Sequence, residues 1–400
     1  MKKPLHTEGL FPYASHMASI VETAPLVLNV GAVLLVAATS GLAARRVGLP
    51  AIVGYLLTGL MVSPFTPGLV ADTQQIAILA DIGVVLLLFE VGIEIDLRRI
   101  KNKHGAVLWA SPAQVILGTA LGTVIFLWLD LPLYGAALLA LSIAMSSSVV
   151  IVNITRSRRR TTSVATEEAL LGWSVLQDIT GVAIAAFIIA ILGNEGQNPV
   201  MAVIGLLGFV VLAVIASRLL PSLLKLIRWE SDLFLIYSVA FGLSIAALGT
   251  VVFDIPMALA SFVAGLAINQ SSDTDDVRKA VLPFRDLFQV LFFVIIGTLV
   301  QPGLIVESLP FAAVLLAVMV ALKTLPAFFF ARFGKIGDSH GQLAVGLSQV
   351  GEFSFVLGST ALAAGALSKV QFNAILLAVI ASIIISTLAV RRASRISRSI

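Results

Sequence analysis

The chain has 400 residues, of which 58% are hydrophobic and only 12% are charged. Its mean hydropathy is +1.03, whereas about 25% of the residues of an average soluble domain are charged. This composition excludes a soluble globular protein and indicates a polytopic membrane protein embedded in the lipid bilayer. The sequence contains no cysteine, so disulfide bonds, thiolate metal sites and cysteine nucleophiles are also excluded.

About thirteen apolar segments of spanning or near-spanning length follow one another along the chain. They cover residues 25–44, 51–62, 75–95, 106–129, 133–154, 169–192, 199–220, 233–252, 257–268, 282–300, 309–331, 343–367 and 372–390. These segments predict an all-α membrane domain over residues 25–390. Residues 1–24 contain no continuous apolar core, so we expect an extracytoplasmic N-terminal tail there rather than a cleaved signal.

Basic residues mark alternate ends of these segments. If the segments simply alternate, only Lys2, Lys3 and Lys369 of the 26 Lys and Arg lie on the less basic face, with Lys323 inside the membrane. Short positively charged loops stay in the cytoplasm. The pattern therefore predicts a multi-pass protein of the inner or plasma membrane, with its N-terminus outside and a cytoplasmic basic tail at residues 391–400.

One acidic residue, Asp178, lies in the middle of the segment 169–192. It follows Glu167 and Glu168 by about ten residues, which places it roughly 15 Å inside the membrane at 1.5 Å per residue. A carboxylate at that depth costs roughly 2.5–3.5 kcal/mol on insertion scales and usually marks an ion or proton path. The alternative is an aspartate that only ties two helices together by hydrogen bonds.

Three other segments carry polar residues at a similar depth, roughly 12–15 Å from their cytoplasmic ends. These residues are Lys323, the serine run Ser146, Ser147 and Ser148, and the group Gln349, Gly351 and Glu352, while Gln177 and Thr180 flank Asp178. Unrelated structural features would not be expected to align at one level. We therefore predict that these residues meet in a single polar site near the midplane.

Two of these stretches are expected to interrupt their helices. Successive serines offer hydroxyls to the backbone groups that a break frees, and Gly346, Gly351 and Gly358 weaken the helix of the segment 343–367. The two segments run in opposite directions, and paired broken helices of opposite orientation are typical of inverted-repeat secondary transporters. The sequence therefore predicts two crossed broken helices, with two kinked but continuous helices as the alternative.

Lys323 is the expected charge partner of Asp178. In a buried site each group favours the charged form of the other, so the pair can exchange a proton or a cation for its mutual attraction. Gln177 and the serine hydroxyls offer neutral oxygens to a partly dehydrated alkali ion. The residues form no nucleophile–base pattern, and the four histidines fall in expected loops. We therefore expect no enzyme, no cofactor and no metal beyond an alkali cation at Asp178.

Two further acidic residues each allow two interpretations. Glu90, in the segment 75–95, either lines a path or a dimer seam or has a structural role. Glu352 either is a second titratable site or supports the crossing of the broken helices.

Several motifs resemble the Kef-type branch of the monovalent cation:proton antiporters. They are LPAIVGYLLTG at 49–59, LFEVGIE at 88–94, QD at 177–178, LFFVIIG at 291–297 and GEF at 351–353. The resemblance spans about residues 25–390 and implies a homodimer of thirteen-helix protomers with a sodium/proton-antiporter-like fold. In each protomer, interleaved dimerisation and core helices would work by an elevator motion. The family's ion-binding aspartate corresponds to Asp178, the preceding glutamine to Gln177 and its core lysine to Lys323.

The chain departs from that family in two respects. Kef potassium-efflux systems continue into a cytoplasmic nucleotide-binding domain, whereas no glycine-rich dinucleotide motif follows a strand pattern here. Regulation by nucleotides would therefore need a separate cytoplasmic subunit. In addition, Glu90 occupies a place that is usually apolar in the family's motif.

The sequence thus predicts a secondary active transporter that exchanges K+ or Na+ for H+. The exchange is expected to be electroneutral, because Gln177 is neutral and Asp178 alone would serve both ions. A ligand-gated potassium-efflux channel, a sodium-coupled organic-solute symporter and a transport-inactive sensor are the alternatives. We expect no nucleic-acid partner.

Overall fold

The computed structural model describes residues 11–66, 73–94, 105–147, 150–151, 162–193, 199–227, 229–253, 255, 257–269, 274–351 and 353–396. Every secondary-structure element within these ranges is a helix. The elements are α1 (Phe11–Arg46), α2 (Ala51–Met61), α3 (Thr73–Glu94), α5 (Val107–Trp128), α6 (Leu133–Ala144), α8 (Val164–Leu192), α9 (Pro199–Ile227), α10 (Ser231–Phe253), α11 (Met257–Asn269), α12 (Thr274–Thr298), η1 (Pro302–Leu304), α13 (Ile305–Met319), η2 (Val320–Thr324), α14 (Leu325–Phe333), α15 (His340–Leu347), α16 (Phe353–Ala363) and α17 (Lys369–Ile396).

Eight helices in the described ranges are long and apolar enough to cross a membrane. They include 20 residues of α1, from Val27 to Arg46, and the whole of α8, with 29 residues. Five further apolar stretches of helix are shorter, among them α6 and α16. These findings confirm a multi-pass, all-helical protein, while the expected count of about thirteen spans stays a prediction. Helix α1 begins at Phe11, so part of the expected tail at residues 1–24 is helical.

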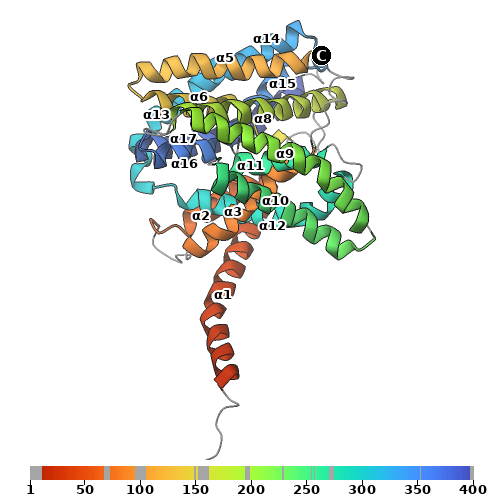
Figure 1. Cartoon of the computed structure of the whole chain (residues 1–400). Coiled ribbons are helices and arrows are strands. Elements are labelled where there is room, and N and C mark those ends of the chain that lie inside the picture. The colour runs from red at the N-terminus through yellow and green to blue at the C-terminus, as the bar shows by residue number, and fades with distance from the viewer. Residues whose placement is uncertain are drawn as a thin grey trace, which may run out of the picture.

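The helices form two bundles, which Figure 1 shows one above the other. The first bundle contains α1, α2, α3, α10, α11 and α12, and the second contains α5, α6, α8 and α13 to α17. Helix α9 contacts α10 and α11 of the first bundle and α8 of the second. Since neighbours in sequence such as α3 and α5 lie in different bundles, each bundle is assembled from two distant parts of the chain.

Glycine residues allow close packing of helices in the first bundle. A Cβ atom on Gly92 of α3 would lie 2.9 Å from the Cα of Gly265 on α11. A Cβ on Gly59 of α2 would lie 2.7 Å from the Cα of Gly297 on α12. Small residues at membrane helix contacts let two backbones approach closely, and van der Waals packing then holds the helices together.

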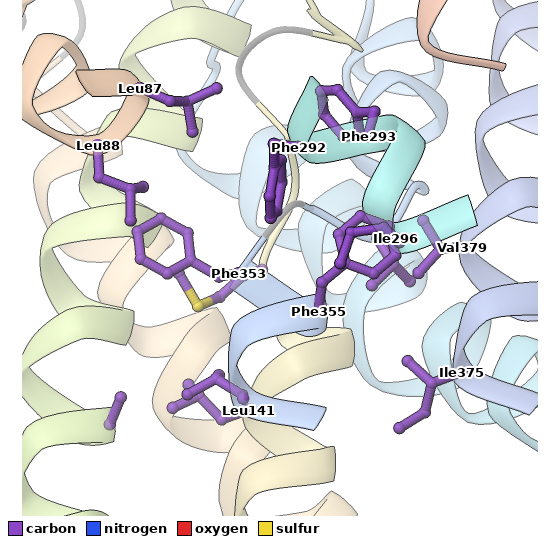
Figure 2. Close-up of a cluster of buried hydrophobic side chains, with 14 of the residues drawn as sticks. Leu87, Leu88, Leu141, Phe292, Phe293, Ile296, Phe353, Phe355, Ile375 and Val379 are labelled. Atoms are coloured by element: carbon purple, nitrogen blue, oxygen red, sulfur yellow. The ribbon is translucent and has the colours of Figure 1, made fainter. Parts of the chain in front are cut away.

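An apolar seam joins the two bundles (Figure 2). It consists of Leu87 and Leu88 of α3, Phe292, Phe293 and Ile296 of α12, Leu141 of α6, Phe353 and Phe355 of α16, and Ile375 and Val379 of α17. The ring of Phe355 lies edge-on to both Phe292 and Phe293, with centroids 6.2 and 6.4 Å apart. Edge-to-face pairs of this kind contribute about 0.5–1.5 kcal/mol each beyond their burial. The contact between the bundles is therefore made of apolar and aromatic surfaces.

Glu90 is a fully buried carboxylate of the first bundle. Its two oxygens pair with two arginines of α12, at 2.9 Å from Nε of Arg278 and 2.7 Å from Nη1 of Arg285. Arg285 also pairs with its exposed neighbour Asp286. Glu90 therefore ties α3 to α12, as its structural interpretation requires.

We expect Glu90→Gln to lower the thermal unfolding temperature of the purified protein. Removing one partner of a buried ion pair leaves an uncompensated charge, which costs about 3 kcal/mol or more when the remaining group is fully buried. Arg278 and Arg285 keep some solvent access, with 33% and 18% of their side chains exposed, so a smaller loss is expected. The control is Lys279→Ala, which removes an exposed ion pair to Asp276 worth about 0–1 kcal/mol. Equal unfolding temperatures for the two variants would contradict a stabilising role of Glu90.

Candidate functional site

Two stretches of the second bundle leave the helical conformation at buried positions, after α6 and between α15 and α16. Helix α6 ends at Ala144, and Met145 is extended, with φ −95° and ψ 146°. Ser146 and Ser147 continue without helical structure. Helix α15 ends at Leu347, and α16 begins only at Phe353. Both helix ends fall in the stretches where the sequence predicted a loss of helix, while two crossed broken helices stay a prediction.

The two interruptions are hydrogen-bonded to each other. The Gly351 N–H donates to the Met145 carbonyl at 3.2 Å, and the Ser146 hydroxyl donates to the Leu347 carbonyl at 2.7 Å. The Gln349 side chain accepts from Ser147 N and donates to Ser147 O, both at 3.0 Å. The Gln349 amide thus supplies the acceptor and the donor that a neighbouring main chain would otherwise offer. Backbone groups that leave a helix inside a membrane need such a partner.

Gly351 lies where the two interruptions are closest. A Cβ atom on this residue would lie 2.9 Å from the carbonyl carbon of Ser146 and 3.0 Å from the nitrogen of Ser147. Both of these atoms belong to the main chain and cannot rotate away. A residue without a side chain is therefore required at this contact.

Lys323 holds the two interruptions together. It lies in η2, one wide π-helical turn between α13 and α14, and is 1% exposed. Its ammonium donates to the Met145 carbonyl at 3.0 Å and to the Gln349 carbonyl at 2.7 Å. These carbonyls follow the C-terminal ends of α6 and α15, which carry partial negative charge that a cation stabilises.

This arrangement corrects the expected pairing of Lys323 with Asp178. In the described part of the chain, both hydrogen bonds of the Lys323 ammonium go to main-chain oxygens. The reason is that the Met145 and Gln349 carbonyls lie within reach of the ammonium. They need a donor from the protein because no water is available to them inside an apolar bundle.

Asp178 lies halfway along the uninterrupted helix α8 and is 2% exposed. The preceding residue, Gln177, is fully buried and accepts a hydrogen bond from Ser146 N at 3.2 Å. Thr180 is half-buried two positions further along the same helix. Asp178 thus follows directly after the residue that joins α8 to the interruption of α6.

Gln114 of α5 is a site residue that the sequence analysis missed. It is fully buried, its Oε1 accepts from Gln177 Nε2 at 2.5 Å, and its Nε2 donates to the Ala144 carbonyl at 3.3 Å. The available signal was its place, about eight residues from the cytoplasmic end of the segment 106–129 and thus roughly 12 Å deep. An uncharged amide between Ala113 and Val115 is a weaker signal of an ion site than an intramembrane carboxylate.

The remaining predicted residues divide into two groups. Ser148 and Glu352 lie outside the described residues, so their expected roles stay predictions. Glu90 lies in the first bundle with its arginine partners. Within the described ranges no group of three or more His, Cys, Asp or Glu could hold a metal ion.

We expect Gly351→Ala to destabilise the protein, because the new methyl group would push against the Ser146–Ser147 main chain. Overpacking of this kind costs about 1–3 kcal/mol, measurable as a lower thermal unfolding temperature. The control is Gly341→Ala in α15, where nothing lies within 4 Å of the added Cβ. Alanine is the better helix former by about 1 kcal/mol, so that variant should be neutral or slightly more stable. If Gly351→Ala were as stable as Gly341→Ala, the close contact would not be required.

Comparisons with known proteins agree with this geometry. The family model described as sodium/hydrogen exchanger, transmembrane, matches residues 31–394. YbaL of Escherichia coli (strain K12), a protein named as a cation/proton antiporter, is 30% identical over 377 residues, which are 90% of this chain and 67% of YbaL.

Solved structures show the same fold. A structure of the sodium proton antiporter MjNhaP1 from Methanocaldococcus jannaschii at pH 8 superposes with a TM-score of 0.70 at 17% identity, covering 92% of this chain and 98% of that one. A second structure of MjNhaP1 gives a TM-score of 0.64 at 16% identity, covering 91% and 94%. The expected antiporter-like fold and the wider family are thus confirmed: the chain belongs to the sodium/hydrogen exchanger family.

Proposed function

We propose that the protein exchanges a monovalent cation, K+ or Na+, for protons across the membrane, and that Asp178 binds the two ions in turn. The observation that carries this proposal is a carboxylate, 2% exposed, halfway along a helix long enough to span a membrane. Its neighbour Gln177 is bonded to the interruption of a second helix. Family membership and the 30% identity to YbaL, named as a cation/proton antiporter, support the same function.

The chemistry of exchange follows from one buried negative charge. A carboxylate in this position is costly unless a proton or a cation neutralises it. Either ion is sufficient, so the two ions compete and each weakens the binding of the other by linkage. With a proton or a cation bound, the Asp178 site is neutral and moves between the two sides of the membrane more easily than the empty, charged site. This difference couples the cation flux to the proton flux.

The two-bundle architecture supports an elevator mechanism as part of this proposal. The second bundle carries the interrupted helices and Asp178, and it meets the first bundle through the apolar seam. Van der Waals contacts have no strong directional preference, so such surfaces can shift along one another at moderate cost. The first bundle would then serve as the fixed dimerisation part of a homodimer.

The finer assignment rests on the motifs of the sequence. The Gln177–Asp178 pair and the motifs at 88–94 and 291–297 favour the Kef-type branch, and they suit K+ as well as Na+. The distribution of basic residues supports a cytoplasmic C-terminus.

We expect Asp178→Asn to abolish cation-driven proton flux in proteoliposomes while leaving the protein folded. An amide has nearly the same shape as the carboxylate but cannot bind a proton or balance a cation. The control is Asp81→Asn, which changes an intramembrane acid of α3 in the first bundle and should keep wild-type flux. Normal flux from Asp178→Asn, with K+, Na+ and Li+ tested in turn, would refute the proposed site.

We further expect one-for-one exchange that moves no net charge. Because protons and cations compete for Asp178, the cation concentration needed for half-maximal flux should rise about tenfold per pH unit below the pKa of the site. An imposed membrane potential should drive no net cation uptake when no ion gradient is present. Uptake under voltage alone would show that a second charge, from Lys323 or Glu352, takes part in the cycle.

A further inference from the structure

Two buried glutamines form a closed hydrogen-bonded ring around the end of α6. Gln177 Oε1 accepts from Ser146 N at 3.2 Å, and Gln177 Nε2 donates to Gln114 Oε1 at 2.5 Å. Gln114 Nε2 then donates to the Ala144 carbonyl at 3.3 Å, and Gln177 Nε2 shares that carbonyl at 3.3 Å. The ring therefore starts and ends on the main chain, on either side of Met145.

The main chain dictates how both amides are oriented. Ser146 N–H can only donate, so the Gln177 atom that faces it must be the oxygen. The Ala144 carbonyl can only accept, so Gln114 must turn its nitrogen towards it. The two remaining amide atoms, Gln177 Nε2 and Gln114 Oε1, then face each other as donor and acceptor. No other assignment satisfies all four bonds.

We propose that Gln114 is a positioning residue for ion exchange, a role that rests on the proposed function of Asp178. Acting through Gln177, it fixes the amide beside Asp178 in one orientation and holds α8 against the interruption of α6. Gln114 and Gln177 have no exposed surface, so neither amide can replace a lost bond with a bond to bulk water.

The ring also keeps position 177 neutral. An ionised carboxylate there could accept from Ser146 N–H with one oxygen, but its other oxygen would face the Ala144 carbonyl and Gln114 Oε1. These are two acceptors, one of which lies at the negative end of α6. The ring thus selects an amide, or a protonated acid, at position 177. Asp178 then remains the single charge-carrying acid of this pair.

The first experiment is a double-mutant cycle on exchange. Gln114→Met and Gln177→Met keep the side-chain length and remove the hydrogen bonds. Each should lower cation-driven proton flux about tenfold, as expected for about 1.4 kcal/mol of lost positioning. If Gln114 acts through Gln177, the double variant should be no slower than Gln177→Met alone. Additive losses would overturn the proposal.

Ser111→Ala is the matched control for this cycle. Ser111 is one turn from Gln114 on α5, is fully buried, and also bonds α5 to α8, by donating to the Trp173 carbonyl at 2.8 Å. Its loss should combine additively with Gln177→Met. If Ser111→Ala were as non-additive as Gln114→Met, the coupling would be a general property of α5–α8 packing, and the specific role of Gln114 would be refuted.

The second experiment uses Gln114→Glu, which preserves shape and so guards against a folding defect. A protonated Glu at this position can donate to the Ala144 carbonyl and accept from Gln177 Nε2, whereas the ionised form would face the carbonyl with a charge. The ionisable groups that the described residues bring to this level are Asp178 of α8 and Lys323 of η2, and both are shared with the wild type. The ratio of variant to wild-type flux should therefore be highest at acid pH and fall as pH rises. A ratio that is constant, or that rises with pH, would contradict the proposal.

Ion exchange at Asp178 and the positioning role of Gln114 are refuted by different results. If wild-type protein shows no cation-driven proton flux, the proposed function is wrong. If the wild type exchanges ions normally but Gln114 and Gln177 contribute additively, exchange stands and only the positioning role of Gln114 is excluded.

Discussion

The structure of the site depends on the pairing of two helix interruptions inside an apolar bundle. Breaking a helix there frees main-chain N–H and C=O groups, and no water is at hand to satisfy them. The protein satisfies them mutually: Gly351 N–H binds the Met145 carbonyl, and the Gln349 side chain binds both polar groups of Ser147. The Lys323 ammonium then supplies a charge that two carbonyls share. Each partner is needed by the other, so the two interruptions form one unit.

The polar network of this unit extends to Gln177, the residue that precedes Asp178. The Lys323 ammonium binds the carbonyls that follow α6 and α15. The amides of Gln114 and Gln177 bind two further buried groups at the end of α6, the Ala144 carbonyl and the Ser146 N–H. Asp178 lies next to this network on an unbroken helix. The network ties the helix of Asp178 to the end of α6, so the proposed elevator motion would carry the carboxylate and its surroundings together as one unit.

The first bundle has a different physical basis. Its helices approach closely at paired glycines, and the buried Glu90 is neutralised by arginines of α12. These contacts favour a rigid body, whereas the apolar seam offers the second bundle a surface with little directional preference. The proposed elevator motion uses this contrast: polar and close-packed contacts lie within the bundles, and apolar contacts lie between them.

The sequence by itself determined the membrane class, the all-helical fold, the wider family and the stretches in which α6 and α15 end. It could do so because hydropathy, helix rise and helix-breaking residues such as Gly351 act locally, within one segment of the chain. Only the tertiary structure decided that Lys323 binds main-chain carbonyls rather than Asp178, that Glu90 pairs with Arg278 and Arg285, and that Gln114 completes the ring with Gln177. Depth along a helix fixes the level of a side chain but not the direction in which it points. The partners of Lys323 and Glu90 are therefore set by how distant helices pack, since Lys323 and Met145 are 178 positions apart in the chain.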